Sequence, residues 1–350
     1  MDEGSSRVGR RRLLKGLARM GGLGIVGRFG FPLAAQLYVD AARAQDGSAD
    51  SSGTRLILLG TQGGPNFNAT RSEAASALVI DGKTYLVDCG YGALGALRKA
   101  GLSFRDVGNV FLTHLHDDHV GDVAALLSHQ WTDGRTDATL VMGPYGTKNL
   151  VEASLAFAAA NAAIRLVDED RSVKPVDVFR GQDIQATQTP VEIYADDRVS
   201  VSSIENTHFP ESTKRKIPYR SLSYRFDSDT RSVTFSGDTA YSEGLVRLAR
   251  DADVLVCETI EVASMRQAFE RKVANGSYAD NAEGVWNHIV GTHTSTEDAG
   301  RMAAEAGVKT LVLNHLLPGA LLPVGDETYL AGVRKHFAGE VIVGKDLMTL

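Results

Sequence analysis

Short apolar runs rich in β-branched residues recur along this chain, separated by turn residues and by segments with helical periodicity. Such runs predict buried strands, and apolar positions that repeat every three to four residues predict helices packed on one face. The predicted strands are Leu56–Leu59, Ala77–Ile80, Tyr85–Val87, Val110–Leu112, Thr139–Met142, Val199–Ile204, Leu222–Phe226, Ser232–Phe235, Val254–Val256, Thr310–Leu313 and Val341–Val343. The predicted helices are Ala93–Ala100, Asp122–Ser128, Thr147–Ala160, Glu243–Ala249, Val262–Ala274 and Thr296–Ala306. The pattern therefore predicts a mixed α/β fold.

Two segments between these elements carry separate predictions. The length of the chain fits a single domain that spans residues 55–350 with a lid or insert, and residues 157–199 are the best candidate for that insert. The Gly-rich segment Gly60–Asn66 follows the first predicted strand, but it lacks the spacing of a phosphate-binding P-loop. It is interpreted either as a loop that faces a substrate or as a plain turn.

The N-terminus has the order of a twin-arginine signal peptide. Gly9–Lys15 is basic, residues 16–37 are Gly-rich and mildly apolar, and Ala-Arg-Ala at 42–44 fits a cleavage site. Residues 1–44 are therefore predicted to direct the chain to the twin-arginine export machinery, and the mature protein to be periplasmic or secreted. Residues 45–54 are predicted to be a linker. A disordered basic tail is the alternative interpretation of the same residues.

Charge and cysteine content narrow the classes of function. The full chain has a net charge of −6, and removal of the basic leader makes the mature chain more negative. An acidic surface repels polyanions, so nucleic acid is not expected as a partner. The only two cysteines, Cys89 and Cys257, end apolar runs and are predicted to be buried free thiols.

Candidate chemistry is concentrated in the segment Thr113–His119, which follows a predicted strand and contains three imidazoles and two carboxylates. Histidine nitrogen and carboxylate oxygen are common zinc ligands. A loop that leaves a strand can direct His114 and His116 to one metal, and Asp118 with His119 to a second. A His-rich surface loop is the alternative.

This H-x-H-x-D-H motif resembles that of the metallo-β-lactamase superfamily, which implies an αββα sandwich in a single domain. The resemblance implies three later ligands in the order His, Asp, His, and His208, Asp238 and His315 each follow an apolar run. It further implies two Zn²⁺, or another divalent metal, in a binuclear site. The implied ligand sets are His114, His116 and His208 for one ion, Asp118, His119 and His315 for the other, and Asp238 as a bridge.

Two segments are similar to those of the subgroup that contains tRNase Z and zinc-dependent arylsulfatases. They are Ser236–Thr239 with the following Glu258, and Gly291–Thr296. The resemblance implies that His293 protonates the leaving group and that Glu258 steadies it. The alternative is that His293 caps the following helix region and Glu258 braces a loop.

These observations predict an exported hydrolase of small esters, with sulfate or phosphate esters favoured. A hydroxide bridging the two metals would be the nucleophile, and Asp118 with Asp238 would orient it. The basic arm with which tRNase Z grips tRNA is not found in the sequence, and this argues against tRNA as the substrate. Other hypotheses are a lactonase or β-lactamase-type acyl hydrolase, an iron-dependent oxidoreductase and a tRNase Z-like nuclease; a homodimer is left open.

Overall fold

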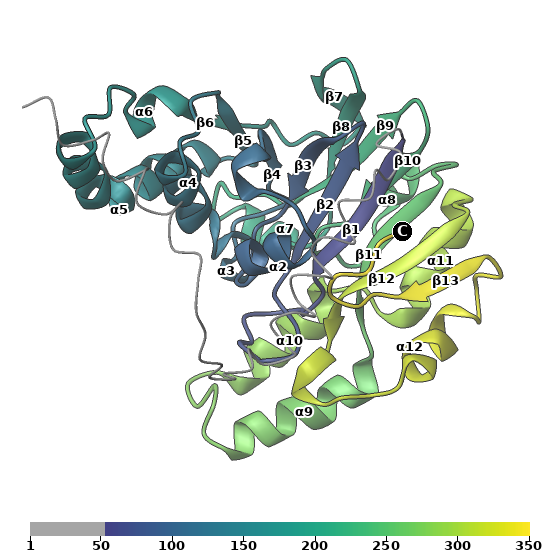
Figure 1. Ribbon diagram of the computed structural model, residues 1–350. Helices are drawn as coiled ribbons and strands as arrows, with labels where there is room; N and C mark the ends of the chain where they lie inside the picture. Colours follow the sequence, from purple (N-terminus) through teal and green to yellow (C-terminus); the bar gives the residue numbers. More distant parts are fainter. Residues whose placement is uncertain (1–52) are drawn as a thin grey trace, which may run out of the picture. The chain divides into compact units, whose positions relative to one another are not determined.

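A computed structural model describes residues 53–350, which form two sheets with helices on their outer faces (Figure 1). The first sheet has the strand order β1-β2-β3-β4-β5-β6, with bounds Thr54–Gly60, Ala75–Ile80, Lys83–Val87, Asn109–Phe111, Thr139–Gly143 and Phe179–Asp183. The second has the order β13-β12-β11-β10-β9-β8-β7. From β7 to β13 the bounds are Val191–Ala195, Val199–Glu205, Leu222–Ser228, Ser232–Phe235, Val254–Ile260, Thr310–Leu317 and Glu340–Val343. The predicted signal and most of the predicted linker lie outside the described residues, so export stays a prediction.

The core lies between the two sheets. Leu78, Tyr85 and Phe111 of the first sheet pack with Phe226 and Val256 of the second, and all five are buried. The ring of Phe111 meets that of Phe226 edge to face at 5.0 Å, which is a favoured aromatic geometry. Burial on both faces explains why β2 and β11 are largely continuous apolar runs, whereas β9 alternates apolar and polar residues.

Helices cover the outer face of each sheet. Those on the first sheet are α2 (Ala93–Lys99), α4 (Val123–Thr132), α5 (Thr147–Asp168) and α6 (Pro175–Val178). Those on the second sheet are α8 (Glu243–Leu248), α11 (Thr296–Ala306) and α12 (Asp326–Val333). The remaining helical segments are α3 (Asp117–Val120), α7 (Glu211–Lys214), α9 (Val262–Ala274), α10 (Ala282–Thr292) and two short 3₁₀ turns, Phe104–Asp106 and Gly319–Leu321. The predicted αββα sandwich is confirmed.

The segment 157–199 is not an insert, and that prediction is wrong. Its first part completes α5, and β6 and β7 then form the edge strands of the two sheets. Edge strands are only partly buried, so their apolar signal is weak: in β7, Ile193 and Tyr194 are half-buried and the other three residues are exposed. The segment therefore belongs to the sandwich.

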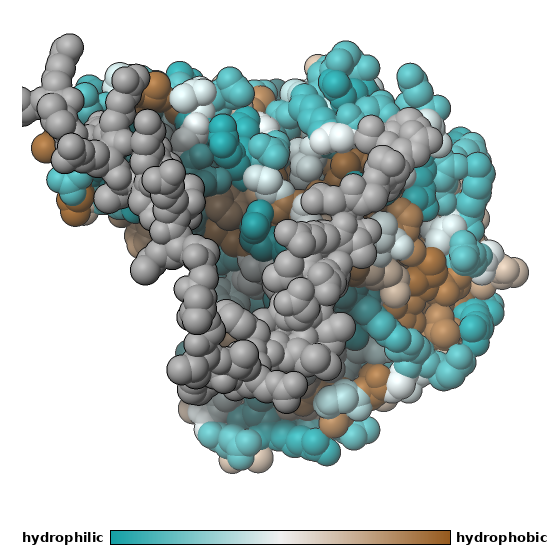
Figure 2. Space-filling model, in the orientation of Figure 1, coloured by the Kyte–Doolittle hydropathy of each residue, from teal (hydrophilic) through white to brown (hydrophobic). Residues whose placement is uncertain are grey.

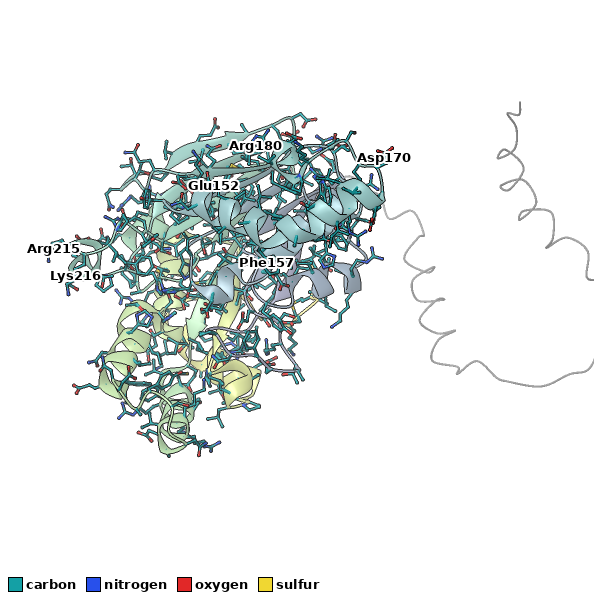
Figure 3. All side chains as sticks on the ribbon, turned by 90° about the vertical axis from the view of Figure 1, so that its left-hand side faces the viewer. Glu152, Phe157, Asp170, Arg180, Arg215 and Lys216 are labelled. Atoms are coloured by element: carbon teal, nitrogen blue, oxygen red, sulfur yellow. The ribbon has the colours of Figure 1, made fainter. Side chains whose placement is uncertain are left out.

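α5 has two different faces. By length and composition it could cross a membrane, but Val151, Ala158 and Ala162 are buried in the core beside the first sheet. On the opposite face Phe157 is 74% exposed, and it lies with Glu152 on the side of the molecule shown in Figure 3. Packing of one face on a sheet is what a helix of the sandwich layer requires.

Candidate metal centre

Four candidate ligands lie in the loop that follows β4. His114 and His116 precede α3, and Asp118 with His119 lies inside this short helix. His114, Asp118 and His119 are almost completely buried. β3 and β4 are parallel, so their carboxyl ends meet at one edge of the sheet and place this loop there.

The other three candidates come from the second sheet, and each is buried. His208 follows β8 and Asp238 follows β10. His315 lies inside β12 rather than after it, because the strand continues to Leu317. The β11–β12 register shifts next to this position, and His315 has a φ of 43°. Such a bulge turns a side chain away from its regular direction, here toward the cluster.

The structure brings all seven predicted ligands together. One group contains His114, His116, His208 and Asp238, and a second contains Asp118, His119, His315 and Asp238. Within each group, one ligand atom per residue lies within 4.8 Å of all the others. Asp238 directs Oδ1 toward His119 Nε2 at 3.2 Å and Oδ2 toward His114 Nε2 at 3.8 Å. Its two oxygens therefore face different groups, as a bridging carboxylate must.

The donor atoms fit a metal ion. His116 Nδ1 lies 3.0 Å from His114 Nε2 and 3.2 Å from His208 Nε2, so three ring nitrogens converge. Protons between these rings cannot satisfy all three nitrogens together, whereas one cation can. In the second group, His119 Nε2 and Asp238 Oδ1 lie 3.2 Å apart without the alignment of a hydrogen bond, and neither atom has another hydrogen-bonding partner. Buried polar atoms are otherwise almost always paired, so the group is built for a ligand.

Charges in the cluster compensate one another. Burial lowers the pKa of His114 and His208 well below the usual value, so both are neutral. For His119 burial acts in the same direction, but Asp238 and the neighbouring carboxylates outweigh it and raise its pKa. Burial of Asp238 is likewise outweighed by His315 and His119, which hold its pKa well below the usual range. The buried carboxylates thus need positive charge beside them, and a divalent metal bound at these groups would supply it.

Supporting contacts fix the ligand imidazoles. His208 Nδ1 lies 3.1 Å from the carbonyl oxygen of Thr292, the last residue of α10. A carbonyl only accepts, so Nδ1 carries the proton and Nε2 is left free for a metal. His119 Nδ1 lies 2.9 Å from Asp88 Oδ2, and Asp88 in turn accepts from the backbone N–H of Thr113.

Asp88 was missed by sequence reasoning as a site residue. It follows β3 directly and has a φ of 58°. A carboxylate at the end of a parallel strand, next to the strand that leads to His114, was the available signal.

Replacing Asp88 by asparagine is expected to lower metal affinity about 10–100-fold. The amide can donate to His119 Nδ1, which would move the ring proton to Nε2, the atom that faces Asp238. Metal titration against a competing chelator measures this. Asp81→Asn, in a turn where the carboxylate accepts from the N–H of Gly53 and from no other described residue, is the matched control. Wild-type affinity in Asp88→Asn would show that Asp88 does not set the tautomer.

His293 and Glu258 lie beside the two groups. His293 Nδ1 is 2.8 Å from Glu258 Oε2, and the other carboxylate oxygen accepts from the N–H of Thr239. Burial raises the pKa of Glu258. Burial opposes the charge of His293, but Glu258 outweighs it and raises that pKa to about 9. The pair can therefore hold a proton close to Asp238.

The alternative interpretation was that His293 caps the following helix region and that Glu258 braces a loop, and the structure agrees only with the second part. Ser295, not His293, caps α11, because its hydroxyl accepts from the N–H of Asp298. Glu258 does brace the loop of Thr239, as the alternative stated. Glu258 therefore both supports a loop and contacts His293.

Comparisons with known proteins agree with this geometry. Residues 54–268, more than half of the chain, match the family described as Anti-Pycsar protein Apyc1. The protein named Ribonuclease Z from Mycobacterium avium (strain 104) is 30% identical over 296 residues, which cover 83% of this chain and 96% of that one. The chain belongs to the metallo-β-lactamase-fold hydrolases, the family that includes both of these matches. It is thus a metal-dependent hydrolase by family.

Solved structures show the same fold at lower identity. Human tRNase Z, short form, is 19% identical with a TM-score of 0.57, and the match covers 85% of this chain and 98% of that one. Zn²⁺-bound PqqB from Methylobacterium extorquens is 16% identical with a TM-score of 0.56, covering 85% and 99%. Zinc is therefore bound by a protein that shares this fold.

The family relationship corrects two predictions. A hydrolase of small sulfate or phosphate esters with no nucleic-acid partner is not what the relatives indicate, because proteins named Ribonuclease Z match this chain over almost their whole length. An acyl hydrolase is not favoured either. The net charge of the whole chain was a poor guide, since recognition depends on the charge beside the site.

Proposed function

We propose that this chain is a metal-dependent phosphodiesterase that cleaves RNA, as the name of its relatives says of them. The observation that carries the proposal is the His293–Glu258 pair beside Asp238. Cleavage of an RNA phosphodiester releases a ribose oxygen, which is a poor leaving group unless it receives a proton. His293 would donate that proton, and Glu258 would hold its ring through Nδ1 and stabilise the protonated form.

The seven clustered ligands would hold two zinc ions. When bound, zinc supplies an activated water at neutral pH and neutralises charge on the phosphate. The chain's own residues would supply the rest: Asp88 and the Thr292 carbonyl orient ligand rings, and Asp118 with Asp238 accepts hydrogen bonds from the attacking water.

A basic segment next to the site supports an RNA substrate. Residues 210–220 include α7 and begin two residues after His208. Lys214 is engaged with Glu205 and Glu211, but Arg215 and Lys216 are exposed and extend from the molecule in Figure 3. Exposed cations beside a phosphodiesterase site would contact phosphates away from the cleaved bond.

Aromatic side chains line a groove between this segment and the site. The groove has a volume of about 440 Å³, and His116, Phe209 and Tyr219 are among its walls. Tyr219 also lies 6.0 Å, ring to ring, from the exposed Tyr145. Stacking of unpaired bases on such rings is a common way to bind single-stranded RNA.

The proposal is tested with zinc-loaded protein, RNA that has an unpaired 3′ extension, and bis(4-nitrophenyl) phosphate. We expect cleavage of the RNA to a hydroxyl end and a phosphate end. The double variant Arg215→Ala/Lys216→Ala should raise KM for RNA several-fold and weaken its salt dependence, with turnover of the small diester unchanged. Turnover of aryl sulfates or lactones with RNA left intact would refute the proposal.

A further inference from the structure

The helical pair α9 and α10 forms a wall on one side of the metal cluster. The two helices lie together at the lower end of Figure 1, and they share a separate apolar cluster that includes Met265, Phe269 and Ile289. Phe269 stacks on Tyr278, in the connection between the helices, with ring centroids 5.6 Å apart. The opposite face of α9 is hydrophilic, as the lower edge of Figure 2 shows. The wall therefore has its own packing and presents a defined surface to the site.

A cavity of about 270 Å³ lies between this wall and the cluster. On the side of the wall it is lined by apolar and aromatic groups, among them Met265, Tyr278 and Ile289. On the other side it is lined by Asp118, Asp238 and the rings of His116 and His293. This volume is close to the lower end for ligand pockets, roughly 300 Å³, so the cavity suits one small group such as a single nucleotide.

The loop Gly60–Asn66 closes the cavity on a third side. A Cβ at Gly63 would lie 2.7 Å from the carbonyl oxygen of His315, so glycine is required for the loop to pass this close. Gly64, Pro65 and Asn66 line the cavity. Of the two interpretations of this loop, the geometry matches the one in which it faces a substrate.

Lys272 of α9 supplies an ammonium group to this cavity, on the side away from the metal cluster. Its Nζ donates to Asn66 Oδ1 at 2.5 Å and lies 5.8 Å from the centre of the Tyr278 ring. Among residues 53–350 it forms no ion pair, although the chain is acidic. A partly buried ammonium whose hydrogen-bonding partner is a neutral amide has no counter-charge, so an anionic ligand can pair with it.

We propose that this cavity binds the nucleotide next to the cleaved bond. Its base would pack on Tyr278 and the apolar wall, and its second phosphate, the one not cleaved, would bind Lys272. The inference rests on the proposed function, because that function identifies RNA as the substrate. The cavity and Lys272 would then select the nucleotide that binds beside the metal cluster. Alternatively, Lys272 only links α9 to the loop Gly60–Asn66 through its hydrogen bond to Asn66. That structural role requires a hydrogen-bond donor but no positive charge.

Equilibrium binding of adenosine 3′,5′-bisphosphate and adenosine 5′-monophosphate to the zinc-loaded protein tests this. The wild type should bind the bisphosphate more tightly, and Lys272→Ala should remove about tenfold or more of that preference. Lys272→Arg should retain it and Lys272→Gln should lose it, since only arginine keeps the charge. Lys335→Ala, which removes an exposed lysine paired with Glu297, is the matched control.

Equal binding of both probes by the wild type, or a preference retained in Lys272→Gln, would overturn the proposal. Melting temperatures of the variants separate loss of binding from loss of fold. If RNA is cleaved but the Lys272 variants keep the preference, the pocket is wrong and the nuclease function stands. If the preference depends on Lys272 but no RNA is cleaved, the pocket stands and the nuclease function fails.

Discussion

Replacing Asp238 by alanine is expected to empty both metal groups and to abolish hydrolysis. Its Oδ1 lies 3.2 Å and 3.3 Å from Nε2 of His119 and His315, and its Oδ2 faces His114. Loss of a supporting residue costs about 10–100-fold in metal affinity, and loss of a shared ligand should cost more at each group. Metal analysis of the purified variant measures the effect.

Two variants make the Asp238 result interpretable. Asp238→Asn keeps the shape of the side chain, so it separates lost coordination from a failure to fold. Asp117→Ala removes the exposed neighbouring carboxylate of the same motif and should leave the metal content at the wild-type level. If only one group empties in Asp238→Ala, the carboxylate is not shared.

Removal of the His293 side chain should slow RNA cleavage by about 10²–10⁴-fold in kcat, the usual contribution of a positioned proton donor. For bis(4-nitrophenyl) phosphate the loss should be much smaller, because nitrophenolate leaves without a proton. Parallel kinetics of His293→Ala on both substrates provide the measurement. Glu258→Gln should show a weaker form of the same substrate dependence, since the amide still contacts the ring.

Metal content decides what a loss of activity in His293→Ala means. His293 also forms a third group with Asp238, Glu258 and His315, whose ligand atoms lie within 4.8 Å of one another. Unchanged metal with a loss confined to RNA supports a proton donor. An equal loss for both substrates points to substrate positioning, and loss of metal would make His293 a ligand.

Much of the fold was predictable because its signals are local. α11 begins after the capping residue Ser295 and ends before Gly307, as its sequence predicts, and α9 has the predicted bounds. The central strands were found because burial on both faces makes them apolar throughout. The candidate ligands were found because each follows an apolar run at a position that the family resemblance implies.

The missed parts depend on contacts between distant segments. α10 contains Gly284 and Gly291, which disfavour a helix, and it is held by packing on α9. Asp88 gains its role only when β3 and β4 pair. Lys272 gains its role only when α9 folds over the cluster and meets Asn66. Each of these contacts joins segments that are separated along the chain, so no short stretch of sequence predicts it.

The error about nucleic acid has a similar origin. Net charge sums over all residues, whereas the exposed Arg215 and Lys216, seven and eight residues after His208, would act locally on a bound RNA. At physiological ionic strength charges are screened beyond about 8 Å, so distant carboxylates have little influence on a phosphate bound there.

The ligands are divided between the two sheets: the loop after β4 supplies four, and strands of the second sheet supply His208, Asp238 and His315. A cation held by both sets acts as a clamp across the sandwich, and only the closed sandwich can bind it tightly. By mass action, each metal at about 100 times its dissociation constant adds about 2.7 kcal/mol to the free energy of unfolding. We therefore expect the thermal stability of the protein to rise with the free metal concentration, and a chelator to lower it as well as to stop catalysis.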